Sequence, residues 1–379
     1  DLWPDSPYTD CTRIVLNAWP GVVSPYGDSD GFGRPAFLAG PYGEYNPADG
    51  DAQATAYYAA LDAVTPKPTL GDWWAANGFN ATGGSGSVDF VNATYLNHND
   101  LGFGRSMNCL KTGQKLACYV TNYGLPDQNS QNADDAEALT NPGATVAMEY
   151  DQAAGVEAVQ FYVYGAGALA SSGRLKFADL DGFGPKPVPY LCQTCHGGGP
   201  GLNANNKAAD AHFREFDLPS FRYSNDRRWD YGQAISAITP TALEFDKFAT
   251  LNKFVRDTNT GNAIADLVNG WYPGNNFTGR PVLPPTPASW AGKENEYNIV
   301  YGQGCRACHV ARDYPDFIGL GGLTTFKSNF VVDKVCGTGS PKVRVMPNAS
   351  VTYRNFWAST PRIHLYETLV GRAIDSCKS

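Results

Sequence analysis

Two five-residue segments of this 379-residue chain combine a pair of cysteines with a histidine at identical spacing. Both fit the pattern Cys-x-x-Cys-His, once over residues 192–196 and once over residues 305–309. Two thiols on one helical turn can add to the two vinyl groups of a haem, and the imidazole that follows reaches the iron from the proximal side. The spacing therefore predicts two covalently attached haems of the c type, held by Cys192, Cys195, His196, Cys305, Cys308 and His309.

Other chemistries use paired cysteines, and three of them compete with this interpretation: a zinc site, a thioredoxin-like redox pair and two disulfide-bonded loops. Zinc ribbons also contain Cys-x-x-Cys pairs, but they do not need a histidine directly after each pair. With nine cysteines and five histidines in the chain, two complete pentads are very improbable by chance. The haem interpretation is therefore preferred.

The sixth ligand of each iron decides between electron transfer and reaction with oxygen or peroxide. For the second haem, Met346 in the Met346-Pro347 loop follows His309 by 37 residues. The last 90 residues or so resemble a class I cytochrome c domain, in which a helix precedes the pentad, a Met-Pro loop supplies the axial sulfur and a terminal helix packs back. The resemblance implies that Cys305, Cys308, His309 and Met346 hold this haem. The competing interpretation is that Met346 only fills the core.

The first haem offers several sixth ligands. His212 lies 16 residues after His196 and is the nearest imidazole in the sequence. The alternatives are an open site or another side chain, namely Met148, Met107, His98 or His364. The choice stays open at this point, although His212 is the first candidate.

The elements that must position these motifs predict an α+β multidomain chain. A haem-free, β-rich region with short helices spans residues 1–165, and mainly helical, loop-rich haem domains span residues 166–286 and 287–379. Helices are expected at 52–64, 69–78, 243–255, 294–301 and 361–370. Strands are expected at 88–91, 116–120, 145–150 and 159–164, where β-branched and aromatic residues cluster.

Five cysteines lie outside the pentads. Cys109 and Cys118 flank a turn-like stretch, which predicts a hairpin disulfide. Cys336 and Cys377 are a further candidate pair, and Cys11 would then stay free or join a second copy of the chain. This cysteine usage, together with a start at Asp1 that shows neither Met nor an apolar leader, predicts a processed protein in the periplasm or outside the cell.

A short acidic element recurs at residues 28–33, 99–104 and 179–184, each ending Gly-Phe-Gly. Paired acidic residues could supply oxygens to calcium, but the twelve-residue spacing of a calcium loop is missing. The preferred interpretation is a repeated turn in which Asp side chains bond to their own backbone.

The charge balance limits the classes of molecule that the chain is expected to bind. The chain has 29 Lys and Arg against 37 Asp and Glu, without a basic stripe, so nucleic acid and anionic membranes are disfavoured. No apolar run of membrane-spanning length occurs. The sequence predicts a secreted dihaem electron-transfer protein that exchanges electrons with a redox partner or an extracellular acceptor, and it identifies no catalytic residue. The alternatives are a dihaem peroxidase or oxygenase whose first haem is catalytic, and a subunit of an electron-conducting assembly.

Overall fold

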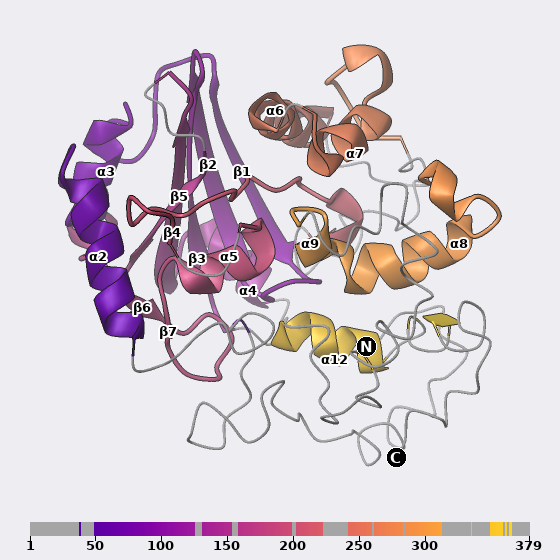
Figure 1. Ribbon diagram of the computed structural model, residues 1–379. Coiled ribbons are helices and arrows are strands. Elements are labelled where there is room, and N and C mark those ends of the chain that lie inside the picture. Colours follow the sequence, from indigo (N-terminus) through magenta and orange to yellow (C-terminus); the bar gives the residue numbers. More distant parts are fainter. Residues whose placement is uncertain are drawn as a thin grey trace.

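The computed structural model describes residues 38, 49–125, 131–153, 158–198, 202–222, 242–259, 261–282, 286–312, 335, 349–358, 361 and 364–365. At its centre lies an antiparallel β-sheet with helices on both faces (Figure 1). This arrangement confirms the coarse prediction of a β-rich N-terminal half followed by helices.

The sheet is formed by β1 (Phe90–Asn97), β2 (Gly104–Thr112), β3 (Lys115–Tyr123), β4 (Pro142–Asp151) and β5 (Gln160–Tyr164). The spatial order is β5-β4-β3-β2-β1, and the short β8 (Phe221–Arg222) pairs with the free edge of β1. The predicted strands overlap β1, β3, β4 and β5. The sequence did not predict β2, because its first half is polar and lacks β-branched residues, and its pairing with both neighbours fixes it instead.

One face of the sheet is covered by α2 (Gly50–Asp62) and α3 (Leu70–Ala76), which confirm the first two predicted helices (Figure 1). A capping box between Thr69 and Asp72 begins α3. The chain leaves α3 through Gly78, which has φ of +83° and so takes the left-handed conformation that glycine tolerates.

A third helix, α4 (Gln131–Ala138), also packs on the sheet, against β1, β2 and β3. It comes so close that a Cβ on Gly104 would lie 1.6 Å from the carbonyl oxygen of Asn132. Only glycine fits at this point of β2.

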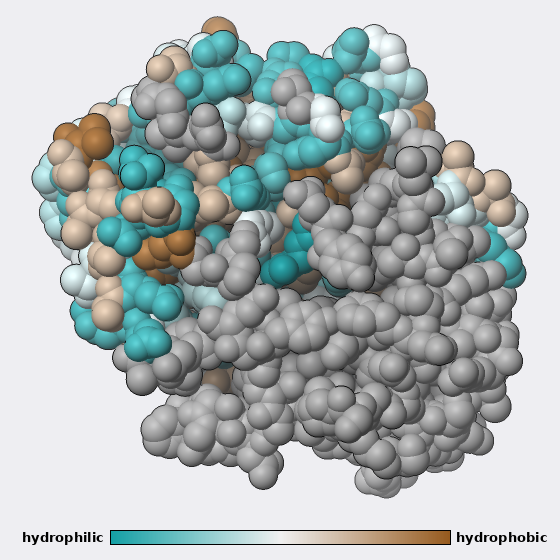
Figure 2. Space-filling model, in the orientation of Figure 1, coloured by the Kyte–Doolittle hydropathy of each residue, from teal (hydrophilic) through white to brown (hydrophobic). Residues whose placement is uncertain are grey.

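The opposite face of the sheet carries the two motifs. The helices on this side are α5 (Tyr190–His196), α6 (Ala242–Thr258), α7 (Ala263–Trp271), α8 (Glu294–Glu296), the π-helical η6 (Tyr297–Gly302) and α9 (Arg306–His309). Aromatic contacts join them to the sheet, as between Phe248 of α6 and Tyr95 of β1, whose ring centroids are 5.7 Å apart. Hydrophilic residues cover much of the described surface over α6 and α7 (Figure 2).

The remaining described elements are short, except for α12. They are η1 (Leu169–Ser171), β6 (Phe177–Ala178), β7 (Lys186–Pro187), η2 (Leu218–Ser220), η4 (Pro273–Asn275), η5 (Ala288–Trp290) and α12 (Ser350–Ala358). The predicted helix at 243–255 is α6, and the one at 294–301 is α8 continued by η6. Most of the helix predicted at 361–370 lies outside the described residues.

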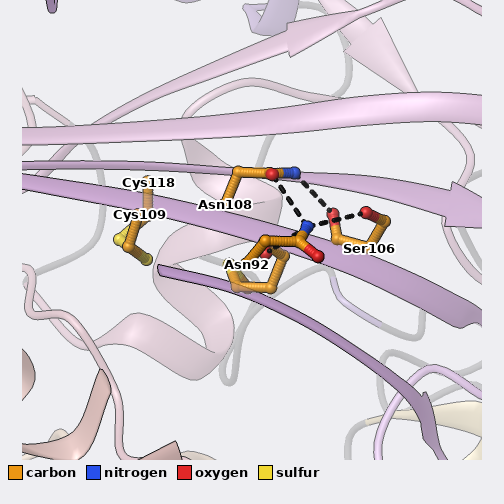
Figure 3. Close-up of a disulfide and its surroundings, with 6 residues drawn as sticks. Asn92, Ser106, Asn108, Cys109 and Cys118 are labelled. Carbon is orange, nitrogen blue, oxygen red and sulfur yellow. Dashed lines mark hydrogen bonds between the residues drawn. A yellow bond between two sulfur atoms is a disulfide. The ribbon is translucent and has the colours of Figure 1, made fainter. Parts of the chain in front are cut away.

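The predicted disulfide between Cys109 and Cys118 is confirmed (Figure 3). The two residues stand directly opposite each other on β2 and β3. Side chains alternate between the faces of a strand, so Asn92 and Asn108 lie on the other face, where the amide of Asn92 donates to Oδ1 of Asn108 at 2.8 Å (Figure 3).

Among the described residues, a continuous hydrophobic cluster runs from α2 and α3 through the sheet to α5, α6 and α7. The division at residues 165 and 286 stays a prediction. In the part of the chain that the structure describes, no helix is long and apolar enough to cross a membrane.

Candidate haem-binding site

The two pentads lie next to each other although 113 residues separate them. The first forms most of α5, and the second forms α9 with Cys305 as its N-cap. The Sγ atoms of Cys195 and Cys308 are 3.4 Å apart. All four motif cysteines are free thiols, so the pairs are not closed as disulfides in this structure.

His196 is anchored through its Nδ1 atom and through its main chain. Its Nδ1 lies 2.8 Å from the carbonyl oxygen of His212, and the backbone N–H of His212 donates to the carbonyl of His196 at the same distance. A hydrogen bond at Nδ1 fixes the tautomer and leaves Nε2 for a metal. The ring of Phe161 packs against the imidazole, with centroids 5.4 Å apart.

The charge state of His196 suits the same role. Burial, helped by the positive charge of Arg214, lowers the pKa of His196 to about 3. The imidazole is therefore neutral at ordinary pH, which is the form that binds iron.

The thiols are less reactive in the folded chain. Burial raises the pKa of Cys192 and of Cys305 to about 12. The hydrogen bond between Cys195 and Cys308 lowers the pKa of Cys308 and raises that of Cys195. Because the thiolate is the nucleophilic form, burial makes Cys192 and Cys305 weaker nucleophiles in the folded chain.

A cavity of about 90 Å³ lies between His196, the sheet and the second motif. The sheet contributes Tyr95, Arg105, Met107 and Met148 to its wall. Residues 213–217 line another side, and Gly302, Gln303 and Ala307 bring the second motif to the same space.

Charged side chains gather around this cavity. Arg214 pairs with Asp100 at 3.5 Å, and Arg306 donates to Asp217 at 2.5 Å in a pair that is almost wholly buried. Glu215 is 6% exposed, and neither of its carboxylate oxygens has a hydrogen-bond partner among the described residues. Burial raises the pKa of Glu215 to about 7.

The donor groups fit a covalent haem at the first motif: two thiols on one turn, a neutral imidazole anchored at Nδ1, and a cavity beside it with arginines that can bind carboxylates. The cavity is smaller than the roughly 300 Å³ of the smallest ligand pockets. A macrocycle bound here would therefore require the walls to stand further apart than they do in this structure.

The structure brings together some of the predicted sixth ligands. Met107 and Met148 line the cavity that His196 borders, whereas His98 and His364 are not among its lining residues. His212 contacts His196 through its main chain on the Nδ1 side, away from Nε2. His309 is buried on α9. Met346, Cys11, Cys336 and Cys377 lie outside the described residues.

The third copy of the acidic element forms the predicted turn. The carboxylate of Asp179 accepts backbone N–H bonds from Asp181, Gly182 and Gly184, and Asp181 pairs with Lys186 at 2.7 Å. Within the described ranges, no three His, Cys, Asp or Glu side chains form a group that could hold a metal ion. Calcium stays a prediction.

The sequence pointed to neither Arg306 nor Arg312. Arg306 is a variable residue of the second motif, yet it is 3% exposed and its guanidinium lies 5.7 Å from the ring centre of Trp271. Arg312 donates to the carbonyls of Gln193 and Thr194 in the first motif. Both roles depend on contacts between distant segments, which no local pattern reveals.

No protein-family model, no curated protein and no solved structure matches this chain.

Proposed function

We propose that this chain is a dihaem c-type cytochrome that transfers electrons in an oxidising compartment, the periplasm or the cell exterior. The observation that carries the proposal is the pair of Cys-x-x-Cys-His motifs, the first of which presents a neutral, anchored His196. The Cys109–Cys118 disulfide supports an oxidising compartment.

Cys192, Cys195 and His196 would hold the first haem, and Cys305, Cys308 and His309 the second. The haems supply one-electron chemistry when bound. The chain contributes burial by aromatic residues around both motifs, which lowers the local dielectric constant and favours the less charged ferrous state. Arg105 and Arg214 provide positive charge beside the first motif.

The partner of this chemistry is a redox protein or an extracellular acceptor. The net charge of −8 favours a partner with a basic surface. Met346 remains the proposed sixth ligand of the second haem. For the first haem, Met107 and Met148 now stand beside His212 as candidates, because they line the cavity next to His196.

Spectroscopy of the purified ferric protein tests electron transfer. Two low-spin haems that do not change when cyanide or peroxide is added would support a pure electron carrier. A high-spin signal that binds cyanide would contradict it, because it reveals an open coordination position.

One observation favours peroxide chemistry at the first haem as a second candidate. Glu215 and Arg214 line the cavity that His196 borders, and a carboxylate whose pKa is about 7 can both take up and release a proton near neutral pH. Rapid consumption of peroxide that is lost in Glu215→Gln, while both haems remain attached, would support this function over electron transfer.

A further inference from the structure

The two motifs contact each other through their second cysteines. Sγ of Cys195 lies 3.4 Å from Sγ of Cys308, and α5 and α9 pack side by side (Figure 1). At this distance the two thiols share a hydrogen bond, and the sulfurs are further apart than the roughly 2.05 Å of a disulfide bond.

Two further features hold the motifs in this position. Arg312 lies three residues after the second motif, and its Nη2 donates hydrogen bonds to the carbonyl oxygens of Gln193 and Thr194 at 3.3 and 3.1 Å. These carbonyls belong to the last turn of α5, where the helix dipole favours a cation.

The second feature is a close backbone approach. Gly197 directly follows the first motif and has φ of +80°. Its backbone lies so close to Ala311 that a Cβ at this position would be 1.9 Å from the Ala311 carbonyl oxygen. The contact between the motifs is therefore held in place by the residues that directly follow each motif histidine.

Covalent attachment of haem would place each of these sulfurs on a porphyrin. The S–H bond adds across a vinyl group, so that sulfur bonds to the carbon next to the ring, the hydrogen goes to the terminal carbon, and no electrons are gained or lost. Each sulfur would then be two bonds from its pyrrole ring, and the 3.4 Å contact between the sulfurs would hold the two ring edges within about 10 Å of each other.

We propose that the two haems form one coupled pair, joined edge to edge through the thioether sulfurs of Cys195 and Cys308. The inference rests on the proposed function, since it needs both haems attached. With both haems attached, the contact between Cys195 and Cys308 would bring them close enough for an electron to pass between them in the half-reduced protein.

Electron paramagnetic resonance of the protein with both haems attached tests the pair. Intact mass first establishes that two haems are bound, and this result tests the proposed function separately. In the fully oxidised protein we expect the two ferric signals to be broadened or split by each other. At a potential where one haem is reduced, the remaining signal should take the shape of an isolated haem.

Variants locate the coupling. Arg312→Met removes the clamp on α5 and should weaken the magnetic interaction, as should Gly197→Ala, which forces Ala311 away. Arg312→Met is the safer variant because Gly197→Ala also strains the backbone. Lys253→Met is the matched control, since this lysine is 45% exposed on α6 and pairs only with Asp257 among the described residues.

Three outcomes would overturn the inference. Ferric signals that simply add in the two-haem protein would show separate haems and leave the proposed function standing. Coupling that is unchanged in both Arg312→Met and Gly197→Ala would show a different route. A Cys195–Cys308 disulfide in peptide maps would show that these sulfurs bond to each other instead of to the haems.

Discussion

The two faces of the sheet accommodate carboxylates in different ways: Glu149 is half-buried on one face, and Glu215 is buried on the other. On the face covered by α2 and α3, Glu149 accepts hydrogen bonds from Lys67 and Tyr162 on one oxygen and from Asn77 on the other, at 2.7 to 2.9 Å. On the motif face, Glu215 has no hydrogen-bond partner for either oxygen among the described residues. Both oxygens of Glu149 have hydrogen-bond partners within the protein, whereas burying the Glu215 carboxylate without such partners costs free energy.

This difference indicates that Glu149 contributes to the stability of the fold and Glu215 to a binding site. A fully bonded carboxylate under α2 and α3 stabilises the fold and leaves nothing for a ligand. An unpaired carboxylate beside an arginine and a neutral histidine is the kind of local conflict that folding alone does not favour. The motif face is therefore where a bound group is expected to complete the structure.

Removing the carboxylate of Glu149 should have the largest effect on stability. Glu149→Leu leaves Lys67, which is 7% exposed, as an uncompensated buried cation. We expect a loss of about 3–5 kcal/mol in the free energy of unfolding, measured by urea denaturation. The haem content should not change.

Asp51→Ala is the matched control for this prediction, because Asp51 pairs with Lys176 on the surface, where the two side chains are 65% and 43% exposed. Its effect should stay within about 1 kcal/mol. A cost for Glu149→Leu no larger than that of Asp51→Ala would remove the contrast between the two faces.

Glu215→Gln should have a smaller effect, and one that depends on pH. The unfolded carboxyl ionises near pH 4.5 and the folded one near 7, so the folded state binds more protons between these values. The stability that the protonated carboxyl contributes is fully present below pH 4.5 and is lost as the pH rises through 7, a change of about 3 kcal/mol. Glu215→Gln should flatten this slope in urea unfolding measured across the same range.

Glu137→Gln, at an exposed position of α4, serves as the control and should keep the wild-type pH profile. A wild-type profile that does not fall between pH 4.5 and 7, or a Glu215→Gln profile that falls just as steeply, would show that Glu215 is ionised and bonded in the folded protein.

The smallest effect on stability is expected for the candidate iron ligands on the motif face. Met107→Leu and Met148→Leu conserve volume and should each cost less than about 1.5 kcal/mol. The variant that removes the sixth ligand of the first haem should lose its axial signature in the near-infrared and EPR spectra. The same spectra of His212→Ala and Met346→Leu test the other two candidate sixth ligands. An axial signature that is unchanged in Met107→Leu and Met148→Leu but lost in His212→Ala would identify His212 as the sixth ligand of the first haem.

Much of the scaffold could be predicted because its signals are local. The Ala-rich run of α2 and the aromatic strands β3 and β5 each carry their pattern within a few residues. The Cys109–Cys118 disulfide was predictable for the same reason, since a short turn joins the two strands. The strand β2 was not, because its pairing partners on both sides determine it.

The site was predictable only in part. The two motifs could be recognised from spacing alone, but their mutual contact joins Cys195 to Cys308 across 113 residues and depends on tertiary packing. The same holds for the sheet methionines near His196. His212 is near His196 in sequence, yet its main chain occupies the Nδ1 side of the imidazole, a position that sequence distance cannot reveal.

The mass of the intact, denatured protein tests the central claim most directly. Two covalently attached haems predict a mass equal to the polypeptide plus two haems, falling by one haem in Cys192→Ala/Cys195→Ala and in Cys305→Ala/Cys308→Ala. Cys109→Ala/Cys118→Ala should keep both haems. A protein purified from a host that attaches haem to Cys-x-x-Cys-His motifs, yet with the mass of the polypeptide alone, would contradict the account.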